Sequence, residues 1–170
     1  MKDQFIGAMR RLVYPVCIAS TNTNGENLAI TLSSVTSVSI DPPSLLACIN
    51  KTSSFLSSLK IYDHLNINFL AAHQKEIATL CSSRKYRNER FEGNEWLNNA
   101  NSIPYLRESQ SIAFCQVANM MEHDTHLIIV ASINEMILDD LGEPNPLLYC
   151  NGEYVTLKDN LSFCDNGFSN

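Results

Sequence analysis

Residues 31–53 read TLSSVTSVSIDPPSLLACINKTS, and this stretch decides the predicted fold. Six of its first nine residues carry a hydroxyl group, a double proline follows, and the apolar run LLACI comes next. Because proline has no N–H to donate to a neighbouring strand and restricts the residue before it, Asp41-Pro42-Pro43 ends the first strand. The stretch therefore predicts two strands, over residues 29–40 and 44–50, on either side of a turn.

Strands outnumber helices along the rest of the chain. Residues 64–71 alternate apolar and polar side chains, which is typical of a half-buried strand, and Asn24-Gly25 is a strong hairpin signal. Further strands are predicted over residues 13–20, 112–121 and 126–138 and as a pair within 146–157; short helices are predicted over 4–12 and 73–81 and after a cap at Thr52 or Ser53. This pattern predicts a mostly β fold, an antiparallel barrel with peripheral helices.

One domain accounts for the chain. With 170 residues and 45% hydrophobic content, it is long enough to bury a core without disulfides. We expect residues 1–157 to form this domain, with an irregular surface segment over residues 82–105. Residues 158–170 are predicted to be a polar C-terminal tail that frays.

The composition excludes several classes of partner. A net charge of −6 argues against nucleic acid, since phosphate binding needs clustered cations. No apolar run approaches the roughly 20 residues of a membrane span, and the N-terminus has no apolar signal segment. The six cysteines form no CxxC pair, and four of them sit in apolar stretches, where free cysteine behaves as a small hydrophobe. We therefore expect a cytoplasmic protein with no membrane and no nucleic-acid partner.

Familiar catalytic motifs are absent from the sequence. Without a GxGxxG, GxxxxGK[ST] or GxSxG motif, a Rossmann, P-loop or serine-hydrolase site is not expected. A cysteine–histidine nucleophile stays open, although no cysteine stands in an evidently cationic, exposed setting. His123 and His126 suggest a metal site, but residues three apart on a strand point to opposite faces unless they straddle a turn. We interpret HDTH as a polar hairpin turn and expect no metal.

The hydroxyl-rich strand has two interpretations. It is either the solvated face of an ordinary strand, or a surface whose hydroxyls and backbone amides bind a flavin ring edge and a phosphate. Asn50-Lys51-Thr52-Ser53 combines an amide, a cation and hydroxyls at the predicted start of a helix, which suits an anion. Simple helix capping explains the same residues equally well. The residues alone leave both questions open.

An ordered set of motifs resembles the flavin-reductase-like family, which includes the small reductase components of two-component monooxygenases such as that of 4-hydroxyphenylacetate 3-monooxygenase. The matches begin with TLSSVTSVSIDPP, the apolar strand after it, and the N-x-x-S of Asn50 to Ser53. FIGAMRRL resembles the family's opening helix, INFL its vNvL strand, Arg90-Phe91 its RF pair, Thr125-His126 its GTH or GDH strand start, and PLLYCNGEY its closing motif. The resemblance spans residues 5–157.

The resemblance implies a split β-barrel, FMN-binding fold that forms a homodimer and reduces FMN or FAD with NADH or NADPH. It implies that the flavin lies along the hydroxyl-rich strand, with its phosphate at the following loop. The residues that match the flavin-binding positions are Thr31, Ser33, Ser34, Val35, Thr36, Asn50, Lys51, Ser53 and, for flavin or dinucleotide phosphates, Arg90. His126 matches the family histidine near the nicotinamide and is the predicted catalytic residue. The protein mainly orients two rings, because hydride transfer from nicotinamide C4 to flavin N5 is cofactor chemistry.

The implied function is an NAD(P)H:flavin oxidoreductase that supplies reduced flavin to a separate oxygenase component. Ala29, Asp124 and Ala131 stand where the family often has glycine. These departures keep a second hypothesis open, a flavin-binding electron carrier or sensor without NAD(P)H turnover. A purely structural strand without a ligand is the third.

Overall fold

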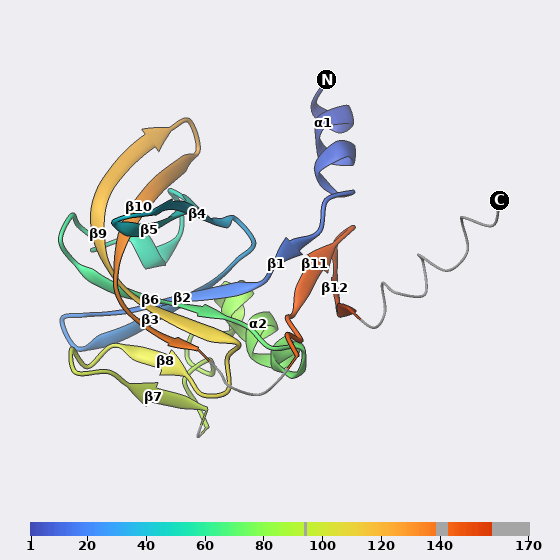
Figure 1. Cartoon of the computed structure of the whole chain (residues 1–170). Coiled ribbons are helices and arrows are strands. Elements are labelled where there is room, and N and C mark those ends of the chain that lie inside the picture. Colours follow the sequence, from blue (N-terminus) through green and yellow to red (C-terminus); the bar gives the residue numbers. More distant parts are fainter. Residues whose placement is uncertain (94, 139–142, 158–170) are drawn as a thin grey trace.

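The computed structural model describes residues 1–93, 95–138 and 143–157. Within these residues the main sheet has seven strands in the order β3-β2-β6-β9-β10-β5-β4, and its neighbouring strands are antiparallel. Figure 1 shows this sheet curled into a barrel with helices at its periphery. The predicted mostly β fold is confirmed, and the predicted tail over residues 158–170 lies outside the described residues.

The strands of the main sheet are β2 (Cys17–Thr23), β3 (Glu26–Leu32), β4 (Val35–Ile40), β5 (Pro43–Asn50), β6 (His64–Phe69), β9 (Ser111–His123) and β10 (His126–Leu138). One small sheet contains β1 (Tyr14–Pro15), β11 (Leu148–Cys150) and β12 (Glu153–Val155), and another contains β7 (Trp96–Asn98) and β8 (Pro104–Leu106). The helical elements are α1 (Lys2–Met9), α2 (Lys75–Ser82) and the 3₁₀ helices η1 (Ser54–Leu56), η2 (Ala72–Gln74) and η3 (Arg84–Tyr86). None of the helices in the described ranges is long and apolar enough to cross a membrane.

The hydroxyl-rich stretch forms two strands rather than one. β3 pairs with β2, whereas β4 pairs with β5, and Ser33 and Ser34 form the corner between them. The predicted single strand over residues 29–40 is therefore wrong, because its two halves belong to opposite ends of the strand order. The predicted turn at the prolines is confirmed, since Ile40 pairs with Pro43 across it.

Two other local predictions have different outcomes. The hairpin signal at Asn24-Gly25 is confirmed, because these residues join β2 to β3 with φ angles of 53° and 84°, a conformation that favours asparagine and glycine. The predicted strand over residues 13–20 is interrupted at Val16, since β1 pairs with β11 outside the main sheet. The segment 82–105, predicted to be irregular, contains η3, β7 and the start of β8.

Strand β6 is more deeply buried than its alternating pattern predicts. Asn66 and Asn68 are 1% and 0% exposed, because the segment that includes β8 covers their face of the strand. Asn66 Nδ2 donates to the carbonyl oxygens of Ile103 and Pro104, and Asn68 Nδ2 donates to that of Ile18. The prediction of a half-buried strand is wrong, and these hydrogen bonds satisfy the polar groups that burial removes from water.

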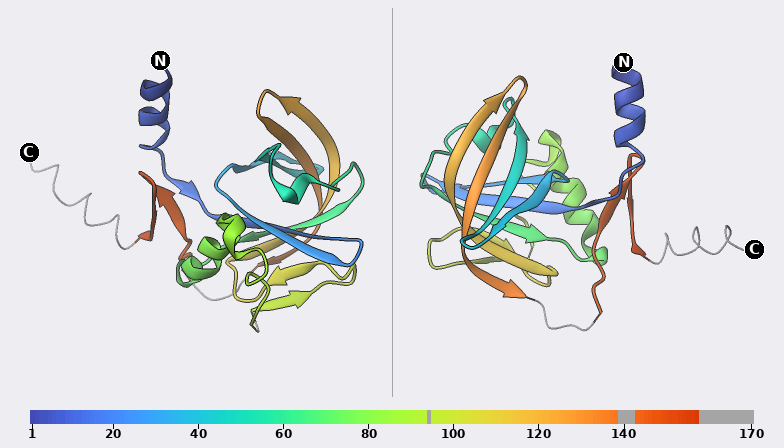
Figure 2. Two further views of the ribbon diagram at one scale, coloured as in Figure 1. Left: turned by 180° about the vertical axis from the view of Figure 1, so that it is seen from behind. Right: turned by 45° about the horizontal axis from the view of Figure 1, so that its top comes forward.

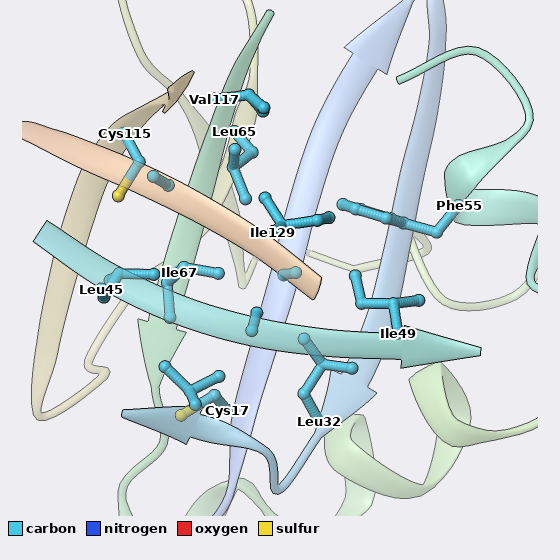
Figure 3. Close-up of a cluster of buried hydrophobic side chains, with 14 of the residues drawn as sticks. Cys17, Leu32, Leu45, Ile49, Phe55, Leu65, Ile67, Cys115, Val117 and Ile129 are labelled. Atoms are coloured by element: carbon cyan, nitrogen blue, oxygen red, sulfur yellow. The ribbon is translucent and has the colours of Figure 1, made fainter. Parts of the chain in front are cut away.

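The barrel core consists of inward-facing side chains of the main sheet together with Phe55 of η1, as Figure 3 shows. A second apolar cluster lies on the other face of β2 and β3, where Ile18 and Ala29 pack with Ile77 of α2. Burying one such aliphatic or aromatic side chain contributes about 1.5–3 kcal/mol. This second cluster fixes α2 beside the end of β3.

Three buried thiols make stability depend on pH. Burial raises the pKa of Cys17, Cys81 and Cys115 from 9.0 to about 12. Their stabilising contribution is complete below the unfolded pKa near 9 and is lost as the pH rises toward 12. We expect the free energy of unfolding to fall in this window by about 1.4 kcal/mol per pH unit for each thiol.

Urea unfolding of the wild type and of a Cys115→Ala variant over this pH range measures the effect. The variant starts from a lower stability but loses it with a shallower pH slope, since one ionising thiol is gone. Identical slopes for the two proteins would contradict the assignment.

Candidate functional site

A cavity of about 730 Å³ lies between the end of β3, helix α2 and the β11–β12 hairpin. Figures 1 and 2 show α2 close to this hairpin, beside the barrel. The cavity is lined by Val16, Thr31, Leu32, Ser33, Lys75, Ser82, Tyr149, Gly152, Glu153 and Tyr154. Its volume is typical of a small-molecule site, and hydroxyl groups, phenol rings, one ammonium and one carboxylate converge on it.

The corner between β3 and β4 brings Ser33 to this cavity. Ser33 is half-buried and also lines a smaller cavity, of about 280 Å³, beside α1. Ser34 is exposed, and its hydroxyl donates to the carbonyl oxygen of Cys48 at 2.7 Å. The break between the strands therefore gives the two serines different surroundings, with only Ser33 lining the cavity.

Three other residues of the predicted flavin strand lie differently. Thr31 lines the cavity, but its hydroxyl donates to the carbonyl oxygen of Ala78 on α2 at 2.6 Å. Val35 packs into the barrel core and Thr36 is exposed on β4, because successive strand residues point to opposite faces. The structure thus brings Thr31 and Ser33 to the cavity and leaves Val35 and Thr36 outside its lining.

The loop after β5 lies beside the C-terminal end of α2. Asn50 Oδ1 accepts hydrogen bonds from the N–H and the hydroxyl of Thr52, both at 2.9 Å. Ser53 caps η1 through its hydroxyl, so the predicted cap is confirmed, but this helix has only three residues and its dipole is weak. Arg84 of η3, which is two residues after the cavity-lining Ser82, donates to the carbonyl oxygen of Thr52. This contact joins the loop to the region of the cavity.

Lys51 connects the same loop to the turn between β9 and β10. Its Nζ lies 3.0 Å from Glu122 Oε2, and its backbone N–H donates to the carbonyl oxygen of Thr125 at 3.0 Å. The ion pair is largely exposed, so it contributes at most about 1 kcal/mol. Lys51 is therefore shared with a carboxylate rather than held free for a ligand phosphate.

His126 stands at the start of β10, next to the loop after β5. Its cross-strand neighbours are Asn50 on β5 and His123 on β9. The ring is exposed, and its Nδ1 lies 2.9 Å from Thr125 Oγ1. The predicted HDTH hairpin turn is confirmed, with Asp124 at a φ of 45°.

Arg90 lies beneath β3 rather than at a ligand surface. The residue is 7% exposed; its Nη1 donates to the carbonyl oxygen of Ala29 and its Nη2 donates to that of Ser83 at 2.8 Å. Because a buried cation needs its partners, this placement makes Arg90 a connection between β3 and the end of α2. It gives no support to the predicted phosphate contact.

Several cavity residues were not predicted from the sequence. Tyr149 and Tyr154 stack edge to face with ring centroids 5.5 Å apart, and the Tyr154 hydroxyl is hydrogen-bonded with Ser82. Burial raises the pKa of Tyr154 against the opposing effect of that hydrogen bond. Lys75 completes the polar lining from the start of α2. These side chains come from α2, β11 and β12. In the sequence, only the motif PLLYCNGEY, which contains both tyrosines, indicated that any of them belongs to the site.

Comparisons with known proteins agree with this architecture. Residues 9–158 match the family described as the flavin reductase like domain. The chain is 29% identical over 155 residues to the reductase component of an FADH(2)-dependent resorcinol hydroxylase from Rhizobium sp. (strain MTP-10005). This alignment covers 89% of this chain and 85% of the relative. It is 30% identical over 150 residues to FMN reductase (NADH) RutF 2 from Methylorubrum extorquens (strain PA1), which covers 88% and 86%.

A solved structure shares the fold over almost the whole chain. BorF, the flavin reductase component of a bacterial two-component tryptophan halogenase, matches with a TM-score of 0.82 over 92% of this chain and 98% of that one. At 23% sequence identity this likeness shows the fold alone. The family match, by contrast, rests on the sequence and confirms the resemblance seen in the ordered motifs. The chain therefore belongs to the family of proteins with a flavin reductase like domain.

Proposed function

We propose that this chain is an NAD(P)H:flavin oxidoreductase that binds FMN or FAD and supplies the reduced flavin to a separate oxygenase. The observation that carries the proposal is the cavity at Ser33, in a chain of the flavin reductase like family. Relatives named as an FMN reductase (NADH) and as the reductase component of a resorcinol hydroxylase support the two halves of the proposal. A cytoplasmic location suits an enzyme that consumes NAD(P)H, and the free thiols of the described cysteines agree with a reducing compartment.

The residues around the cavity fit a flavin. A flavin ring is flat and apolar on its faces and polar along one edge, so it needs both kinds of surface. Leu32 and the two tyrosines, Tyr149 and Tyr154, supply apolar and aromatic surface, while Ser33 and Ser82 supply hydroxyl groups. The cavity volume of about 730 Å³ suits a ligand of this size.

A flavin phosphate fits beside Arg84. The Arg84 guanidinium donates to the carbonyl oxygen of Thr52, which places a cation at the loop that also contains Ser53. Its partner is a neutral carbonyl group rather than a carboxylate, so the positive charge remains available to an anion. Arg84 thus takes the role that the resemblance gave to Arg90, with Asn50 holding the loop in shape.

The chain's own residues bind and orient the reactants. When bound, a flavin supplies the redox chemistry by accepting at N5 the hydride that nicotinamide C4 donates. Ser33 can donate a hydrogen bond to a ring heteroatom on which negative charge develops. The phenol of Tyr154, whose pKa burial raises further, also has a hydrogen to donate. This arrangement does not require an acid–base pair.

His126 is proposed to contact the nicotinamide, and a His126→Gln variant tests this role. Losing one hydrogen bond worth about 1.4 kcal/mol lowers kcat/KM for NADH about tenfold. The Kd for flavin stays unchanged, since His126 does not line the cavity. Steady-state kinetics with a His123→Gln control, which removes the neighbouring exposed ring, isolates the effect. A His126→Gln enzyme with wild-type kcat/KM would remove the role.

A second copy of this chain is the proposed partner of α1. No residue of α1 is buried, and its apolar side chains Phe5, Ile6 and Met9 face a cavity next to Ser33. Figures 1 and 2 show α1 standing away from the barrel. Covering such an apolar face requires another surface. A homodimer therefore also completes the surroundings of Ser33.

Sedimentation velocity tests the homodimer. We expect a species of twice the 19.0 kDa chain mass at micromolar concentration. A Phe5→Asp variant shifts it toward the monomer, because a carboxylate is costly to bury. A Lys2→Glu exchange, which also adds negative charge to α1 but at a polar position, leaves the dimer intact. A wild-type monomer would contradict the proposal.

The described residues give no observation that favours the alternative function, a flavin carrier without NAD(P)H turnover. Ala29 and Ala131, which depart from the family's glycines, are 2% and 0% exposed and pack in apolar clusters, so they serve packing. Mixing the protein with FMN or FAD and NADH or NADPH separates the two functions. Flavin-dependent loss of nicotinamide absorbance is expected for the reductase, whereas flavin binding without this loss would favour the carrier.

A further inference from the structure

The turn between β9 and β10 brings two histidines face to face. His123 ends β9 and His126 begins β10, and the two residues are direct partners in the strand register. Only Asp124 and Thr125 lie between them, so the histidines straddle the turn instead of following one another along a strand. Directly opposed residues have their Cβ atoms about 4.5–5.5 Å apart on the same face. The two rings therefore lie on one face of the hairpin and can share a ligand, unlike residues three apart on a single strand.

We propose that His123 and His126 together bind a divalent late transition metal ion, with Zn²⁺ as the expected occupant. Imidazole nitrogens are preferred ligands of Zn²⁺, at about 2.0–2.1 Å. Two such nitrogens on one tetrahedral ion lie about 3.3 Å apart, within reach of rings whose Cβ atoms oppose each other. Within the described residues no group of three or more His, Cys, Asp and Glu side chains is placed to hold a metal. Water molecules complete the coordination. The affinity for Zn²⁺ is therefore lower than that of a structural site with four protein ligands.

The ring contacts favour this arrangement. Nδ1 of His126 lies 2.9 Å from Thr125 Oγ1, which can accept its proton and leave Nε2 free to bind the ion. Nε2 of His123 lies 3.7 Å from Asp124 Oδ2, so a carboxylate stands beside the pair. Both side chains of this second contact, His123 and Asp124, are exposed, 77% and 89%, so the His123 ring can turn toward an ion at little cost.

The charges around the turn also favour a cation. Asp124 and Glu122 are negative; Lys51 pairs with Glu122, whereas Asp124 lies beside His123. Lys51 is paired with Glu122 at 3.0 Å, and Glu122 precedes His123 on β9, so strand alternation puts this ion pair on the opposite face from the two histidines. The face that carries the histidines keeps the carboxylate of Asp124.

A bound ion has a consequence for the enzyme. It occupies the ring of His126, which the proposed function places at the nicotinamide, so Zn²⁺ inhibits NADH oxidation without blocking the flavin cavity. This consequence rests on the proposed function, whereas metal binding does not. Buried thiols do not compete for the ion, because burial raises the pKa of Cys17, Cys81 and Cys115 to about 12.

Calorimetric titration of the untagged protein with Zn²⁺ tests the site directly. We expect one ion per chain in the wild type and affinity at least roughly tenfold lower in His123→Gln and in His126→Gln, because each variant removes one arm of a chelate. His73→Gln is the matched control, since His73 is also exposed and lies 3.5 Å from a carboxylate, that of Glu108. It binds Zn²⁺ as the wild type does.

Kinetics supply the second readout. Zn²⁺ inhibits NADH oxidation by the wild type and by His73→Gln, whereas His123→Gln keeps the metal-free rate and resists inhibition. Wild-type Zn²⁺ affinity in His123→Gln, or no binding to the wild type, overturns the metal site. Binding at the pair without inhibition supports the metal site and overturns the role of His126 in hydride transfer.

Discussion

A Ser33→Trp variant is expected to lose flavin binding by about 100-fold or more and to lose flavin-dependent NADH oxidation with it. Ser33 is the residue at the β3–β4 corner whose side chain lines the 730 Å³ cavity and the smaller one beside α1. An indole ring at this corner fills space that the flavin needs, and a lost affinity of two decades corresponds to about 2.7 kcal/mol. Quenching of flavin fluorescence measures the Kd.

Ser37→Trp is the matched control for this variant. Ser37 is exposed on β4, within the same hydroxyl-rich stretch, and does not line either cavity. The control therefore adds the same ring to the same stretch without entering the site. A thermal melt of both variants shows that the barrel is intact. Flavin affinity within about threefold of the wild type in Ser33→Trp would place the flavin elsewhere.

Arg90→Met is expected to lower the free energy of unfolding by about 3 kcal/mol while leaving the flavin affinity of the folded protein unchanged. The buried guanidinium donates to the carbonyl oxygens of Ala29 and Ser83, and each hydrogen bond from a charged donor is worth about 1.5–3 kcal/mol. Methionine fills part of the space but leaves both carbonyl groups without a partner. Urea denaturation measures the loss.

Arg87→Met supplies the comparison for Arg90. Arg87 is exposed and pairs with Glu26, so its loss is expected to change stability by less than about 1 kcal/mol. A stable Arg90→Met protein that has lost its flavin affinity would restore Arg90 as a phosphate contact. It would also remove Arg84 from that role.

The local preferences of the residues predicted most of the strands and turns. Pairing between segments far apart in the sequence decided the rest. The turns at Asn24-Gly25 and at the double proline were predicted correctly, because the backbone preferences of these residues act within a few positions along the chain. The break at Ser33 was not predicted, since it depends on β3 and β4 having different partners far along the chain. The burial of Asn66 was missed for a similar reason, because a later segment covers it.

The candidate site was predicted in part. The motif around Ser33 pointed to residues that line the cavity, and His126 lies beside the predicted loop at Asn50. Tyr154 and Lys75 could not be assigned, because only the folded chain brings their elements to one cavity. Periodicity gives the face of a strand or helix but does not identify the element that packs against it.

Anaerobic mixing with NADH deuterated at the transferred position of C4 tests the central claim most directly. We expect the absorbance of oxidised flavin to fall only when protein, flavin and NADH are all present, with one flavin reduced for each NADH consumed. We also expect a primary isotope effect on this rate in the His126→Gln background, where the hydride step is slowed. Flavin that binds to the protein and stays oxidised in the presence of NADH and NADPH would contradict the proposed reductase function.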